Sequence, residues 1–284
     1  DNPATGIVFD YYMPEDMDTT QLTVEIMDEN GSVVRTYSNQ KAKGFKSWPG
    51  GPPAPTTIPS KQGVNRFNWN LRRETLPAVD GVFTLGDYRG SLVPPGNYTL
   101  RLSSPADTIA VQAELLPDPA LDAKPADYAA QQAILRPVEA LVREMHGSVN
   151  RMRKVKAQLN SLNQLLKEFD GTDDLIASGK SIVEQITTWE ENLIQPDQKT
   201  FQDVINFPNQ LAAELMNLKS RVDGAVPAAT AGAQQRLQDL TKVWGVHYGE
   251  LTRIIDEEVV KYNAAYKELG LPALILPEGT AKKP

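Results

Sequence analysis

The first 117 residues alternate hydrophobic and polar residues in short runs, a pattern typical of half-buried β-strands. Leu22, Val24 and Ile26 fall on one face of such a run, and polar residues separate them. Asn30 and Gly31 follow, ahead of a second alternating run. Because both residues accept a positive φ, they predict a hairpin between the two runs.

The run NRFNWNLR, residues 65–72, places Phe67, Trp69 and Leu71 on one face of a predicted strand. This row of large side chains has two interpretations. It is either a platform for a ligand or part of a hydrophobic core. Large apolar faces are usually buried, so we predict that this row belongs to the core.

The remaining pattern completes an all-β region. Residues 41–63 are rich in proline and glycine and predict a long irregular loop. Tyr98, Leu100 and Leu102 then alternate in a further strand, and a last strand ends before Pro117. Some six or seven short strands separated by turns are typical of an immunoglobulin-like or fibronectin-III-like β-sandwich.

After a proline-rich linker the hydrophobic spacing changes to three and four residues, which predicts helices. A single apolar stripe indicates one helix of about 45 residues, roughly 65 Å long. The stripe consists of Ile134, Val138, Leu141, Met145, Val149, Met152, Val155, Leu159, Leu162, Leu166 and Phe169.

Three more amphipathic helices are predicted: one through Trp189, one from near Pro208, and one after Pro227 that Gly270 and Pro272 end. Long amphipathic helices with short connections predict an antiparallel four-helix bundle with long helices. The predicted division is a β-sandwich domain at 1–117, a linker at 118–126, a helical bundle at 127–272 and a C-terminal tail at 273–284.

Composition excludes several kinds of partner and site. The net charge of −7 argues against a nucleic-acid partner, which would require a basic face. No apolar run approaches the roughly 20 residues that span a bilayer. The chain has no cysteine, which excludes disulfides and thiolate metal sites. Because it opens at Asp1 without a signal peptide, we expect a piece of a longer protein.

The candidate chemistry is sparse, and no catalytic residue, metal site or cofactor is predicted. Neither His146 nor His247 has the spacing of a metal motif. His247 lies on its helix's apolar face and is predicted to be a core or boundary residue, whereas His146 is predicted at the surface. Two acidic clusters lack EF-hand spacing and are predicted to be turns or helix caps. They are Glu15, Asp16 and Asp18, and Asp170, Asp173 and Asp174.

The order of several motifs resembles one known module. DNPATGIVFDYYMP, GVNRFNWNLRRE and LVPPGNYTLRL come first, and a long helix with Arg151 and Arg153 follows. QDVINFPNQLAAEL and YKELGLPALILP complete the series. This series is similar to the C-terminal region of large secreted bacterial proteins with BNR or Asp-box β-propellers, often described as sialidase-like, sortilin-like or glycosyl-hydrolase-like.

This resemblance implies a function. In that family the propeller precedes this region and is where a hydrolase site would lie, so no catalytic residue is carried over. The expected function is a non-catalytic accessory region of a secreted or periplasmic protein. Its expected partners are its own upstream propeller and either another protein or a second copy, bound through the helices. The alternative is a carbohydrate-binding module, with a glycan stacked on Trp48 and Tyr88.

Overall fold

The computed structural model describes residues 5–17 and 21–270, and the chain forms two compact units. The described residues of Asp1–Asn150 and Glu191–Trp244 form the strand-bearing unit. Those of Arg151–Glu190 and Gly245–Pro284 form the helical unit. Three sequence predictions, for Asp18, Pro272 and the 273–284 tail, lie outside the described residues.

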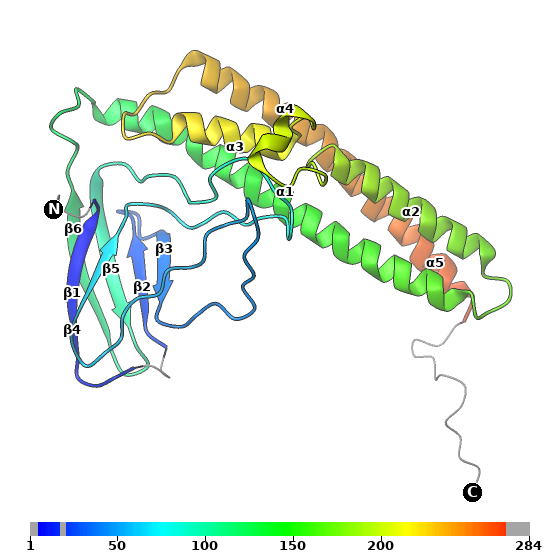
Figure 1. Cartoon of the computed structure of the whole chain (residues 1–284), viewed down its shortest axis with the longest axis horizontal. Coiled ribbons are helices and arrows are strands. Elements are labelled where there is room, and N and C mark those ends of the chain that lie inside the picture. The colour runs from blue at the N-terminus through cyan, green and yellow to red at the C-terminus, as the bar shows by residue number, and fades with distance from the viewer. Residues whose placement is uncertain (1–4, 18–20, 271–284) are drawn as a thin grey trace, which may run out of the picture. The chain divides into compact units, whose positions relative to one another are not determined.

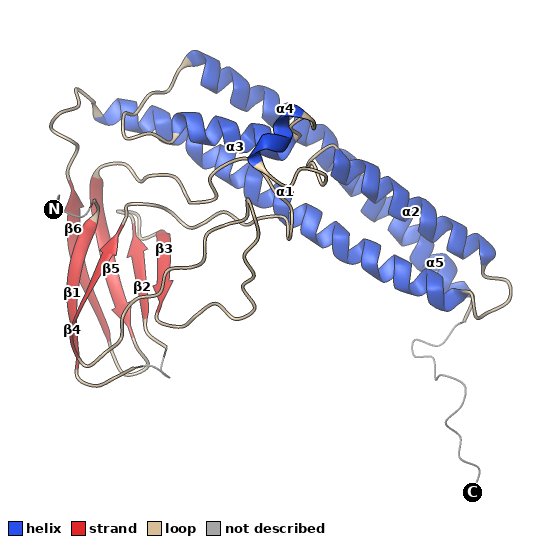
Figure 2. Cartoon of the chain, viewed as in Figure 1, coloured by secondary structure: helices blue, strands red, loops and turns tan. Residues whose placement is uncertain are grey.

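The strands form two antiparallel sheets (Figures 1 and 2). One sheet pairs β1 with β4, and the other has the order β3-β2-β5-β6. The strands are β1 Ile7–Met13, β2 Thr23–Met27, β3 Val33–Ser38, β4 Gly63–Trp69, β5 Gly96–Ser103 and β6 Thr108–Leu115. The predicted hairpin is confirmed, because β2 pairs with β3 and Gly31 between them has a φ of 76°.

The two sheets share one hydrophobic core. Phe67 and Trp69 are buried in it, which confirms the core interpretation of β4. The Trp69 ring meets the ring of Tyr98 edge-on, with centroids 5.2 Å apart, a favourable aromatic geometry. Leu71 contributes to the core differently from the prediction: it lies beyond the end of β4 and has a φ of 63°. The chain therefore leaves the strand in a left-handed turn at this residue.

The predicted immunoglobulin-like or fibronectin-III-like β-sandwich is wrong. The described chain has only a two-stranded and a four-stranded sheet. Residues 71–93, which would supply further strand, form an irregular loop with one isolated bridge between Arg72 and Leu92. We call this segment the 71–93 loop. Its backbone bonds to helical side chains, as described below, so it does not extend either sheet.

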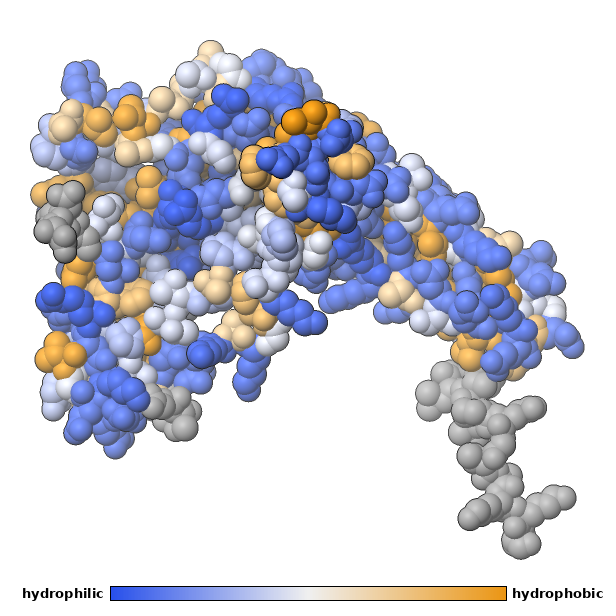
Figure 3. All heavy atoms as spheres, viewed as in Figure 1, coloured by the Kyte–Doolittle hydropathy of each residue, from blue (hydrophilic) through white to orange (hydrophobic). Residues whose placement is uncertain are grey.

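The helices begin within a few residues of the predicted starts. They are α1 Pro125–Leu166, α2 Asp173–Glu191, the 3₁₀ turn η1 Phe201–Ile205, α3 Leu211–Val222, α4 Ala231–Arg253, the π-helical segment η2 Ile254–Val259 and α5 Val260–Glu268. The predicted stripe of α1 is largely buried, as Val138, Met145 and Val149 show. The face of the molecule in Figure 3 is mainly hydrophilic, with hydrophobic residues scattered among polar ones.

The predicted antiparallel four-helix bundle is also wrong. The two compact units divide α1 after Asn150 and α4 after Trp244, so the helices do not form one bundle in the described residues. In the strand-bearing unit, α1 lies beside α3 (Figure 1), and Gln131 donates to the carbonyl of Val222 at 2.8 Å. This part of α1 also contacts the 71–93 loop, which a self-contained bundle would not do.

The last predicted helix is interrupted. Its regular helical turn gives way to the π-helical η2, where one extra residue widens the turn. Ile254 at its start is fully buried, whereas the next residue, Ile255, is 39% exposed. Within the helical unit, the indole of Trp189 on α2 donates to the carbonyl of His247 at 2.8 Å.

Candidate functional site

The 71–93 loop folds back on itself before it reaches the helices. Arg73 N donates to the Ser91 carbonyl at 3.0 Å, and Val93 N donates to the Leu71 carbonyl at 2.9 Å. These bonds close the base of the loop like a short hairpin. They use only part of its backbone hydrogen-bonding groups, so the others need partners elsewhere.

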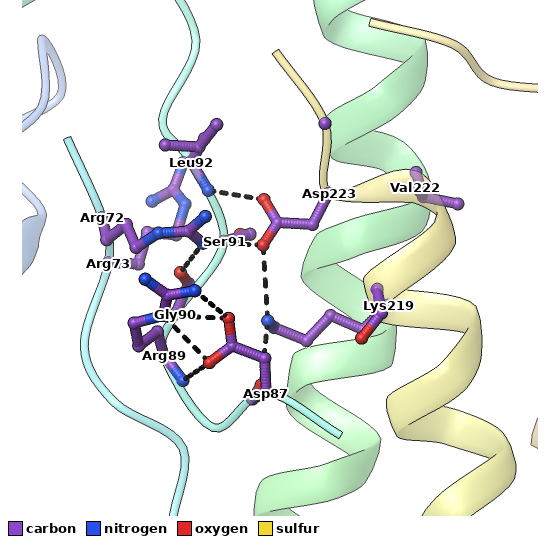
Figure 4. A network of polar contacts seen from close by, with 12 residues as sticks. Arg72, Arg73, Asp87, Arg89, Gly90, Ser91, Leu92, Lys219, Val222 and Asp223 are labelled. Atoms are coloured by element: carbon purple, nitrogen blue, oxygen red, sulfur yellow. Dashed lines mark hydrogen bonds and ion pairs between the residues drawn. The ribbon is translucent and has the colours of Figure 1, made fainter. Parts of the chain in front are cut away.

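Asp223, directly after α3, holds the base of the loop (Figure 4). Its Oδ2 accepts from Arg72 Nη1 at 2.8 Å, and its Oδ1 accepts from Leu92 N at 2.9 Å. The side chain is almost fully buried. A carboxylate at a helix C-terminus is disfavoured by the helix dipole, so the nearby cations must offset that cost as well as desolvation.

Lys219 supplies a second cation from one turn earlier on α3. Its side chain is 0% exposed, and Nζ lies 3.4 Å from Asp223 Oδ2 and 3.2 Å from the Asp87 carbonyl (Figure 4). An isolated buried ammonium would be costly, whereas here it is paired with a carboxylate and donates to a backbone carbonyl. Arg72, Lys219 and Asp223 therefore form a buried ion cluster, which we call the Asp223 network.

A polar stripe along α1 binds the rest of the loop. Its spacing of three and four residues puts the side chains on one helical face, beside the apolar stripe. Glu139 Oε1 accepts from Ser91 N at 2.6 Å, Arg143 Nη2 donates to the Glu74 carbonyl at 2.9 Å, His146 Nδ1 donates to the Pro77 carbonyl at 2.8 Å, and Asn150 Nδ2 donates to the Ala78 carbonyl at 2.8 Å. Each side chain satisfies a backbone group that no sheet satisfies.

His146 is the most deeply buried member of the stripe, with 0% exposure, so the predicted surface position is wrong. The contact with a carbonyl places the proton on Nδ1 in the neutral ring. Burial lowers the pKa of His146, because a charged imidazolium is poorly solvated there. The missed signal is its spacing from Glu139, Arg143 and Asn150, which puts all four on one face.

The two proposed stacking residues lie in different environments. Tyr88 is 2% exposed, and its ring packs 6.0 Å from that of His146, so neither face is open to a ligand. Trp48 is partly exposed and donates from Nε1 to the Val82 carbonyl at 2.9 Å. It lines a shallow hollow of about 760 Å³, together with Phe45 and Pro52. Tyr88 does not line that hollow, so the structure does not bring the pair together.

The other candidate groups do not assemble into a site among the described residues. No group of three or more His, Asp or Glu side chains there could hold a metal ion. His247 is partly buried, and burial lowers its pKa. Asp173 and Asp174 occupy the first turn of α2, where carboxylates suit the helix dipole, as the prediction of a helix cap requires.

Two observations bear on the identity of the chain. None of the described helices is long and apolar enough to span a membrane. No protein-family model matches the chain, and no curated protein matches it significantly.

We predict that Asp223→Asn lowers the free energy of unfolding by roughly 3–5 kcal/mol, because it leaves Lys219 and Arg72 buried without their anion. Chemical denaturation measures the loss. Asp10→Asn is the matched control, because it breaks the exposed ion pair with Arg66 and should change stability little. Equal effects of the two substitutions would contradict the role of the Asp223 network.

We also predict that His146 makes stability fall in mild acid. Its pKa is lowered in the folded state, so the unfolded chain binds the proton more tightly. The contribution is present above the unfolded pKa of about 6.5 and is lost as pH falls below it. The difference in unfolding free energy between wild type and His146→Gln should shrink from pH 7 to pH 5. A difference that does not vary with pH would rule out a buried neutral histidine.

Proposed function

We propose that this chain is a non-catalytic accessory region of a secreted or periplasmic bacterial β-propeller protein. It presents a rigid surface that packs on the propeller and on a further protein partner. The observation that carries the proposal is the Asp223 network together with the α1 polar stripe. Both commit buried charged and polar side chains to backbone atoms of the 71–93 loop.

Rigidity is what such a region contributes to binding. A long irregular loop is ordinarily mobile, and ordering it on association would weaken the complex. Here Glu139, Arg143, Asn150 and Asp223 already hold the loop from two helices. The surface around the loop is therefore ordered before a partner arrives. The resemblance supplies the identity of the first partner, the propeller that precedes this module in the family.

The proposal is tested with the propeller portion of a longer protein that contains this sequence. We expect the separately produced propeller and this chain to form a complex in size-exclusion chromatography. Asp223→Asn should weaken that complex at least about tenfold, because the loop must then be ordered on binding. Asp10→Asn should not. Absence of a complex, or turnover of sialosides or aryl glycosides by this chain alone, would overturn the proposal.

A second function, glycan binding, is favoured by the Trp48 hollow. The indole is oriented by its bond to Val82, and Phe45 and Pro52 add apolar surface beside it. Oriented aromatic rings in shallow hollows suit the apolar faces of sugar rings. Only Trp48 of the two predicted residues serves this function, because Tyr88 is buried.

For glycan binding, we predict that a neutral polysaccharide retards the wild-type chain in affinity electrophoresis. Trp48→Ala should abolish the retardation, because it removes the stacking surface. Trp48→Phe should keep part of it, since a ring remains although the bond to Val82 is lost. Equal migration of all three proteins across a panel of polysaccharides would end this candidate function.

A further inference from the structure

The β3 edge of the four-stranded sheet is covered by the chain itself. Along β3 the outward backbone groups are those of Val34, Thr36 and Ser38. The Val34 carbonyl accepts from Glu74 N at 2.9 Å, and the Ser38 carbonyl accepts from Ile58 N at 3.1 Å. Thr36 N donates to the side chain of Glu74. No strand can add to this edge without displacing these bonds.

The opposite edge, at β6, is open. Ser104 N donates to the Asp107 carbonyl at 2.8 Å and closes the β5–β6 turn. Along an antiparallel strand, the backbone groups of successive residues point alternately towards the partner strand and away from it. Since those of Asp107 point towards β5, the groups that point away from β5 belong to the even-numbered residues from Thr108 to Glu114. In the described part of the chain, no hydrogen bond from beyond β5 reaches the backbone of Ala110, Gln112 or Glu114. All three residues are exposed.

The side chains of β6 do not protect this edge. Natural edge strands are commonly protected from further pairing by proline, lysine or a β-bulge. The sequence of β6, TIAVQAEL, contains neither proline nor lysine, and β6 pairs with β5 without a register shift. Ile109 and Val111 are 58% and 53% exposed. They share a face with Ala113 and Leu115, which pack against the core. The edge thus continues an apolar face into solvent.

We propose that β6 pairs antiparallel with β6 of a second copy of this chain, about a two-fold axis at Val111. Two four-stranded sheets would then become one continuous sheet. In this register Val111 faces its own counterpart, Ile109 faces Ala113, and Thr108 faces Glu114. No two like charges are opposed, and each exposed apolar side chain of the row gains an apolar neighbour.

Symmetry makes a second copy the fitting occupant. A two-fold axis perpendicular to the sheet pairs odd-numbered residues with odd-numbered residues. The rows of apolar side chains of the two copies therefore lie on the same face of the continuous sheet. Both strands also have the same length and the same free backbone positions. The net charge of −7 on each copy opposes association, and salt screens that repulsion. This pairing uses residues of β6 alone, so it is a separate proposal from docking on a propeller.

A single introduced cysteine tests the register, because the chain has none of its own. In Val111→Cys the two thiols face each other across a non-hydrogen-bonded pair, with Cα atoms about 4.5 Å apart, within disulfide range. Oxidation should give a linked dimer on a non-reducing gel. Ile109→Cys is the matched control: its counterpart lies four residues along the strand, roughly 14 Å away, and should not crosslink.

Sedimentation velocity over a range of concentrations tests the edge itself. Ala110→Pro removes an outward N–H that β5 does not use, so it should weaken dimerisation at least about tenfold while the circular dichroism spectrum stays unchanged. Ala110→Ser should dimerise like wild type. A wild-type chain that stays monomeric, or that dimerises without Val111→Cys crosslinking, would overturn the proposal. Neither result affects docking on a propeller, which is measured separately.

Discussion

The structure depends on how the backbone of the 71–93 loop is satisfied. Its base closes on itself, and further backbone groups bond to Glu139, Arg143, His146 and Asn150 on α1 and to Asp223 after α3. A buried backbone group without a partner is costly, so these side chains keep an irregular segment packed where a sheet would otherwise be required. The loop therefore packs without extending either sheet.

The same loop accounts for the asymmetry of the four-stranded sheet. Glu74, within the loop, covers the edge of β3 through both its backbone and its side chain. Arg143 on α1 holds the Glu74 carbonyl, so the cover is anchored to a helix. Nothing comparable among the described residues reaches β6. The β3 edge is therefore covered within the chain, whereas the β6 edge keeps backbone donors and acceptors that can pair with another strand.

The polar residues of the site were harder to predict than its apolar ones. Asp223 and Lys219 stand four residues apart at the end of an ordinary amphipathic helix, and only the approach of Arg72, distant in sequence, makes them a buried cluster. His146 is predicted at the surface because a stripe of apolar residues shows which face of a helix is buried against apolar neighbours. It does not show which polar residues bury themselves against a loop backbone.

The sequence by itself determined the local elements. Period-2 alternation located Val24, Ile26 and Trp69 in the core, and the Asn30-Gly31 pair located the β2–β3 hairpin. The apolar stripe located α1. Local spacing is enough for these predictions, because each pattern depends only on neighbours within a few residues. Tertiary structure alone decided how many strands share a sheet, where the helices divide between units, and which polar side chains meet the 71–93 loop. Those outcomes depend on contacts between segments far apart in the chain, for which local spacing carries no information.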